Sequence, residues 1–120
     1  MDSLHCIELE TIDGVAVVRF KDSRVMDPAR IELMGRELFH LVPDQQPNKI
    51  LVNFENVKFF SSAAINKLIV FDQRVKAAGG NLRLSNLKPE VRDLFSYTKL
   101  DSIFKIDEEQ RDSLESFDAD

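Results

Sequence analysis

Two adjacent serines, Ser61 and Ser62, carry the clearest chemistry that the sequence offers. They lie in the segment FFSSAAI, where a strand-to-helix connection ends and a helix begins. One hydroxyl at that position caps the helix by accepting a backbone N–H, which is worth about 1 kcal/mol. A cap needs only one of the two serines. The other hydroxyl is available for phosphorylation, because the free N–H groups and positive dipole of a helix N-terminus tolerate a phosphate. From local chemistry alone, capping is the simpler interpretation.

The other reactive residue types do not form a recognisable site. His5 and His40 have no second histidine or cysteine at ligand spacing, so we expect no metal site and no cofactor. Gly79-Gly80 stands where a helix is expected to stop, which favours a stop signal over a phosphate-binding loop. No serine is flanked by the glycines of a nucleophile elbow. We therefore expect a protein that is not an enzyme, although a Ser-His-Asp triad built from distant residues stays open.

Charge is unevenly distributed along the 120 residues, which carry a formal net charge of −5. The segment from Asp107 onward holds seven acidic residues against one basic residue, Arg111, which leaves the rest of the chain with a single net positive charge. The acidic residues are Asp107, Glu108, Glu109, Asp112, Glu115, Asp118 and Asp120. This balance, with no binding motif, argues against direct nucleic-acid binding and against docking on anionic membranes.

The compartment expected from the sequence is the cytoplasm. A single cysteine, Cys6, excludes an internal disulfide and suits a reducing environment, where it is expected to be a small apolar residue on a strand. The N-terminal residues show neither a basic region nor an apolar run, so we expect no signal peptide and no membrane insertion.

Hydrophobic periodicity supplies the elements that must position the serines. The predicted elements are strands over 5–11, 15–20, 50–54, 82–85 and 103–106, and helices over 28–42, 62–78, 89–95 and 107–117. Asp13-Gly14 predicts a tight hairpin turn between the first two strands. The Asp107/Gln110 spacing predicts a capping box for the last helix, with Leu114 and Phe117 as its apolar contacts.

This order predicts an α/β fold. An opening antiparallel hairpin is followed by alternating helices and strands, giving a mixed sheet of about five strands and about four helices. The composition, 43% hydrophobic and 31% charged, is ordinary for a globular protein. We expect one domain over 1–120, with its core in about 5–106 and an acidic C-terminal helix over about 107–117.

The layout resembles the STAS domain, and in particular the bacterial anti-sigma-factor antagonists. The resemblance covers roughly residues 5–117 and rests on the opening hairpin, on FENVKFFSSAAINKLI, on KAAGG and on NLRLSNLKPEVRDLFSYTKLDSIFKI. In that family a helix starts at Asp-Ser-Ser/Thr-Gly-Leu. Ser61 takes the aspartate position and Ser62 the phosphoacceptor position, while Ala63 and Ala64 take the Ser/Thr and Gly positions.

The resemblance implies a phosphorylation switch. Its partners would be a serine kinase that is also the anti-sigma factor, and a phosphatase that resets the switch; Ser61 is the alternative acceptor. The loop over 21–27 would border the acceptor. One stripe of residues along the helix over 62–78 would face outward, because the residues of this stripe recur at helical spacing. The expected partner-binding residues are Arg24, Val25, Met26, Ser61, Ser62, Asn66, Lys67, Val70, Gln73 and Arg74.

A second function stays open. STAS domains also serve as interaction modules, scaffolds or accessory subunits, for example of lipid-transport complexes, without obligatory phosphorylation. Ser61 and Ala64 in place of the family's aspartate and glycine favour that alternative.

Overall fold

The structure is a computed structural model that describes residues 4–44 and 49–119. The predicted order of strands and helices is confirmed, with additional short elements. In chain order the elements are β1 (Ile7–Ile12), β2 (Val15–Phe20), β3 (Arg24–Val25), α1 (Pro28–Asp44), β4 (Lys49–Asn53), β5 (Phe59–Phe60), α2 (Ser62–Ala77), β6 (Asn81–Ser85), α3 (Pro89–Tyr97), the 3-10 turn η1 (Leu100–Ser102), β7 (Lys105–Asp107) and α4 (Gln110–Ala119).

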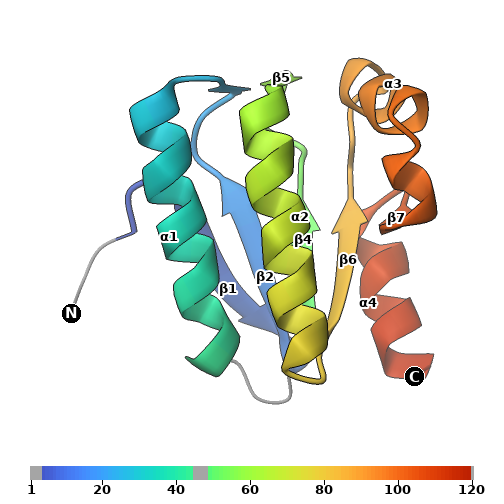
Figure 1. Ribbon diagram of the computed structural model, residues 1–120. Coiled ribbons are helices and arrows are strands. Elements are labelled where there is room, and N and C mark those ends of the chain that lie inside the picture. Colours follow the sequence, from blue (N-terminus) through green and yellow to red (C-terminus); the bar gives the residue numbers. More distant parts are fainter. Residues whose placement is uncertain (1–3, 45–48, 120) are drawn as a thin grey trace.

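Within these residues, the main sheet has five strands in the order β1-β2-β4-β6-β7. The β1–β2 pair is antiparallel, and the remaining neighbours are parallel. Asp13 and Gly14 both have positive φ angles, as a tight hairpin turn requires. The helices α1 and α2 lie side by side across one face of the sheet (Figure 1). The predicted α/β fold with a mixed sheet is therefore confirmed.

The larger core lies between the sheet and the α1–α2 layer. Alternate side chains of the central strands point to that face and are buried, because strand residues have a period of two. The helices add Met34, Leu38, Leu68 and Phe71, each at most 2% exposed. On β2, β4 and β6 the residues of this core are Ala16, Val18, Phe20, Ile50, Val52, Leu82 and Leu84.

The acidic C-terminal helix covers the opposite face of the sheet. Phe117 of α4 is buried against Val15, Val17 and Leu51, and Leu114 packs against the same cluster. This arrangement confirms the two apolar contacts predicted for the last helix. It also explains why β4 is buried on both faces.

The start of α4 corrects a prediction. The helix begins at Gln110 and not at Asp107, and the capping-box interpretation is wrong. Asp107 ends β7, where its carboxylate accepts hydrogen bonds from Arg83 (3.2 Å) and from the Ser113 hydroxyl (2.7 Å). The carboxylate that caps the helix belongs to Asp112, which accepts the Glu109 N–H at 3.1 Å.

Two short strands that the hydrophobic pattern did not predict lie next to the serine segment. β3 pairs in parallel with β5, with Arg24 opposite Phe59 and Val25 opposite Phe60. The Ser61 N–H continues the pairing by donating to the Val25 carbonyl at 3.0 Å. A strand of two residues is too short to show an alternation of apolar and polar residues, so the sequence pattern could not predict this pairing. It holds the 21–27 loop against the start of α2.

Candidate functional site

Ser61 caps α2. Its backbone is extended (φ −75°, ψ 166°), and its Oγ accepts the Ala64 N–H at 3.2 Å. Its carbonyl accepts the Ile65 N–H at 2.9 Å, and its own N–H is held by β3. The hydroxyl of Ser61 is thus engaged in the structural role that the sequence allowed for one of the two serines.

Ser62 is the first residue of α2, and it is exposed. Its hydroxyl has no hydrogen-bond partner within residues 4–44 and 49–119. Ala63 is also exposed, whereas Ala64 is fully buried and adds its methyl group to the core. The pair of serines therefore divides into one cap and one free hydroxyl.

A prediction follows for the cap. Replacing Ser61 by Ala should lower the free energy of unfolding by about 1 kcal/mol, because the Ala64 N–H loses its acceptor. Ser62→Ala serves as the matched control and should change the same free energy by no more than about 0.5 kcal/mol. Urea unfolding of both variants measures the difference. Equal losses for the two variants would contradict the assignment of Ser61 as the cap.

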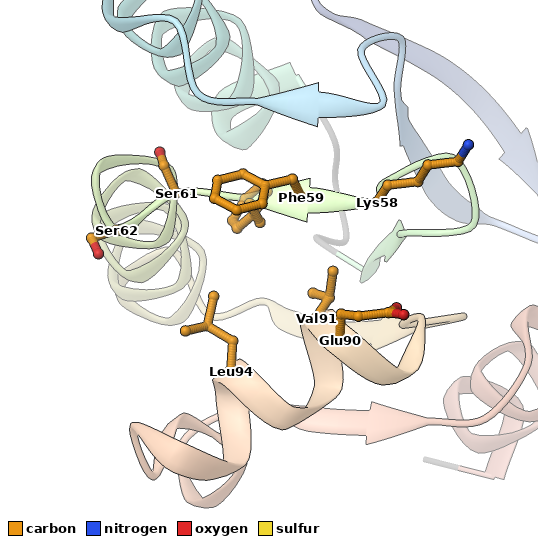
Figure 2. A pocket seen from close by; sticks show the side chains of 8 residues that line it. Lys58, Phe59, Ser61, Ser62, Glu90, Val91 and Leu94 are labelled. Atoms are coloured by element: carbon orange, nitrogen blue, oxygen red, sulfur yellow. The ribbon is translucent and has the colours of Figure 1, made fainter.

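An apolar groove opens beside the two serines, and we call it the α2–α3 groove. It has a volume of about 270 Å³ and lies between β5, the start of α2 and α3. Figure 2 shows Phe59, Ser61 and Ser62 on one side, with Val91 and Leu94 of α3 on the other. Its lining residues are Lys58, Phe59, Phe60, Ser61, Ser62, Glu90, Val91 and Leu94. Neither Phe59 nor α3 was predicted to lie at the site.

The loop before α1 borders the same region. Met26 is 46% exposed, so it is not a core residue, and the Arg24 guanidinium lies 5.5 Å from the centre of the Phe59 ring. Val25 is only 4% exposed. The loop therefore offers the side chains of Arg24 and Met26 at the surface, while Val25 fixes the loop to the core.

The predicted outer stripe of α2 is only partly free. Asn66 and Gln73 are exposed, but Lys67 forms an ion pair with Glu32 of α1 at 2.9 Å. The Arg74 guanidinium stacks on Phe39 of α1, 4.2 Å from the ring centre.

Val70 also turns toward α1, because it lines a hollow of about 290 Å³ between the two helices. Spacing along one helix gave no sign of these contacts, which depend on how α1 packs against α2.

The remaining reactive residues lie apart from this region. His5 precedes β1 and donates its N–H to Glu37, while His40 is exposed on α1. Cys6, just before β1, is buried, and burial is the main cause that raises the pKa of its thiol. The thiol therefore stays protonated at neutral pH and is a poor nucleophile.

No group of three or more His, Cys, Asp or Glu side chains that could hold a metal ion occurs in the described residues. None of the helices there is both long and apolar enough to cross a bilayer.

Comparisons with known proteins agree on one family. The STAS domain family model matches residues 6–113. BtrV of Bordetella bronchiseptica, whose name places it among the anti-sigma factor antagonists, is 25% identical over 100 residues, which are 83% of this chain and 84% of BtrV.

Solved structures share the fold. An anti-sigma-factor antagonist (STAS) domain protein from Planctomyces limnophilus has a TM-score of 0.83 at 22% identity, over 92% of this chain and 96% of that one.

SpoIIAA, a cell fate determinant of Bacillus, is similar in both its unphosphorylated and its phosphorylated form, at 18% identity. The unphosphorylated form has a TM-score of 0.77 over 95% of this chain and 97% of SpoIIAA. The phosphorylated form has a TM-score of 0.67 over 92% and 98%. The chain belongs to the STAS domain family, among whose members are proteins named anti-sigma factor antagonists.

Proposed function

We propose that this protein is a cytoplasmic anti-sigma-factor antagonist that binds a serine-kinase anti-sigma factor and is switched off by phosphorylation of Ser62. The single observation that supports the choice of Ser62 is the different hydrogen bonding of the two serine hydroxyls. The Ser61 hydroxyl is engaged as a cap, whereas the Ser62 hydroxyl is exposed and free of partners in the described part of the chain.

The transfer itself needs only the hydroxyl from this protein. The Ser62 Oγ attacks the γ-phosphorus of ATP held by the kinase, the hydroxyl proton passes to a base of the kinase, and ADP leaves. The product is a phosphoserine that adds a charge of about −1.5 to −2 at the first residue of α2. A phosphatase would return the serine to its free state.

The environment of Ser62 suits both states of such a switch. At the N-terminus of α2, the positive end of the helix dipole stabilises an anion, so the phosphate would not disrupt the helix. No acidic residue occurs in the first turn of α2 to repel it. Phosphorylation would therefore change the surface that a partner meets more than it changes the fold.

Intact-mass spectrometry tests the proposal. Incubating the protein with its candidate kinase and ATP should add one phosphate, about 80 Da in the mass spectrum, to the wild type and to Ser61→Ala, but none to Ser62→Ala. Fragment spectra then assign the position. A phosphate on Ser61 in place of Ser62 would contradict the choice of residue. A phosphate outside both serines, or no phosphate with any serine-kinase anti-sigma factor of the source cell, would contradict the switch.

The runner-up is a constitutive interaction module, for example an accessory subunit of a lipid-transport complex. Ser61 and Ala64 favour it, because they stand in place of the acidic residue and the glycine of the family's acceptor motif. Co-purification from the source cell separates the two functions. Transporter subunits recovered without a kinase would support the module, whereas a kinase and a phosphorylated Ser62 would support the switch.

A further inference from the structure

We propose that the protein binds a free α-amino acid in a polar pocket, which we call the α4 pocket. The pocket lies where β4, β6 and α4 meet, on the face of the sheet that α4 covers. The ammonium group of the ligand would lie at the ends of β4 and β6, and its carboxylate at the start of α4. The inference is independent of the proposed function, because Ser62 begins α2 and α2 packs on the other face of the sheet.

The parallel strands place a row of polar side chains at their carboxyl ends. Arg19 of β2 lies opposite Asn53 of β4, which in turn lies opposite Ser85 of β6. Asp107 of β7 continues the row beside Ser85. Because strand side chains alternate between faces, this row points to the same face as Leu51, which packs in the cluster under α4. Ligands of parallel sheets commonly bind outside the carboxyl ends of the strands, where this row lies.

The wall of the α4 pocket is already ordered by hydrogen bonds. The Arg19 guanidinium donates to Glu10 at 2.9 Å, to Glu55 at 3.2 Å and to the Gln110 oxygen at 2.7 Å. The same Gln110 oxygen accepts from the Asn53 amide at 2.9 Å. The pocket has a volume of about 360 Å³, within the range of about 300–1,000 Å³ that small-molecule ligands occupy. A ligand therefore meets preformed polar groups and pays little to order them.

The ends of β4 and β6 offer acceptors for an ammonium group. Ser85 Oγ and Asn86 Oδ1 are buried and make no hydrogen bond among the described residues. Asn86 lines the pocket, and an unpaired buried oxygen is unfavourable until a donor reaches it. Glu55, which also lines the pocket, receives the Arg19 bond on Oε1. An ammonium has three N–H donors and can bond to the Asn86 oxygen and to the Glu55 carboxylate together.

The start of α4 offers donors for a carboxylate. The backbone N–H groups of Gln110 and Arg111 donate to no residue in the part of the chain that the structure describes. Both residues line the pocket, and the positive end of the helix dipole stabilises an anion there. The Arg111 guanidinium adds a positive charge, although it also pairs with Glu109 at 3.0 Å. The donors and the acceptors thus come from different elements around one pocket.

Charge balance favours a zwitterion over other ligands. Two guanidinium groups, Arg19 and Arg111, and two carboxylates, Glu55 and Glu109, line the pocket. A dianion such as phosphate would face both carboxylates, and a divalent cation would face both guanidinium groups. Every described residue of the lining is polar, so an apolar ligand would leave these groups without partners. A ligand with one ammonium and one carboxylate leaves no charge unpaired.

Nuclear magnetic resonance titration of the full chain tests the inference. The probes are the common L-α-amino acids, each added alone up to about 10 mM. We expect at least one to bind with a Kd below about 1 mM and to shift the amide signals of Asn86, Gln110 and Arg111. The N-acetyl and carboxamide derivatives of that amino acid should bind at least about tenfold more weakly, because each lacks one of the two charges.

Asn86→Gly tests the acceptor without straining the backbone. Asn86 has a φ of 60°, which glycine adopts readily, so the variant keeps the turn and loses only the side chain. We expect its Kd for the same amino acid to rise at least about tenfold. Lys99→Gly is the matched control, because Lys99 has a φ of 62° and does not line the pocket. Its Kd should stay within about twofold.

The contradicting outcomes are distinct. If no amino acid shifts a signal, or if the shifts lie away from Asn86 and α4, water alone fills the pocket and the inference is wrong. Equal binding of the N-acetyl or carboxamide derivative would contradict recognition of a zwitterion. Equal losses for Asn86→Gly and Lys99→Gly would contradict a contact from the Asn86 side chain. None of these results bears on the phosphorylation of Ser62, which the kinase assay measures separately.

Discussion

Ser62→Asp should weaken binding to the kinase by roughly 30- to 1,000-fold, the equivalent of about 2–4 kcal/mol. The carboxylate places a fixed negative charge where the partner must cover the start of α2. Removing a charge from water without giving it a partner costs several kcal/mol, and only part of this is avoided if water stays at the edge of the interface.

The fold itself should tolerate that change. Aspartate is favourable in the first turn of a helix by about 0.3–1 kcal/mol, because it faces the positive end of the dipole. We therefore expect the thermal midpoint of Ser62→Asp to equal or slightly exceed that of the wild type. A loss of binding accompanied by unfolding would not count as evidence for the switch.

Ser62→Asn is the matched control. Asparagine has nearly the same size and shape as aspartate but carries no charge, so the difference between the two Kd values isolates electrostatics from the fit of the side chain. We expect Ser62→Asn to lose at most about tenfold. If both variants weaken binding equally, a phosphate would act through its bulk and the charge argument would be wrong.

The position of the serines was predictable from the sequence, because strong signals surround them. Apolar residues recur at helical spacing after Ser62, and Gly79-Gly80 stops the helix, so α2 runs to Ala77, close to the expected end at Ala78. The choice between cap and acceptor was not predictable. It depends on which serine hydroxyl accepts the hydrogen bond from the Ala64 N–H, and a hydrophobic pattern does not distinguish two adjacent serines.

The surface around the serines could not be predicted because it is built by tertiary contacts. The groove joins Phe59 to Leu94, which come from different elements, and the two-residue strands that hold the loop have no period to detect. Likewise, Arg74 has the spacing of an exposed stripe and Lys67 flanks that stripe, yet residues of α1 contact both side chains. The prediction of a capping box at Asp107 was wrong for a similar reason, since Arg83 and Ser113 both donate hydrogen bonds to the Asp107 carboxylate.

Phe54→Ala should have the largest effect on stability, lowering the free energy of unfolding by about 3–5 kcal/mol. Phe54 is fully buried, and its ring centre lies 5.1 Å from that of Phe20, 5.2 Å from that of Phe60 and 6.0 Å from that of Phe95. The truncation removes these aromatic contacts and leaves a cavity where four rings meet. Because a domain is stable by only about 5–15 kcal/mol, urea unfolding should show the loss clearly.

Phe59→Ala is the control of the same residue type. Phe59 is 44% exposed and lies outside the core, so its truncation should cost about 1 kcal/mol or less. Phe54→Ala should also loosen the acceptor segment, because its partner Phe60 leads directly into Ser61. Hydrogen exchange should then speed up at the amides of residues 60–65 more than at those of β1. Equal losses of stability for the two variants would contradict the central place of Phe54 in the core.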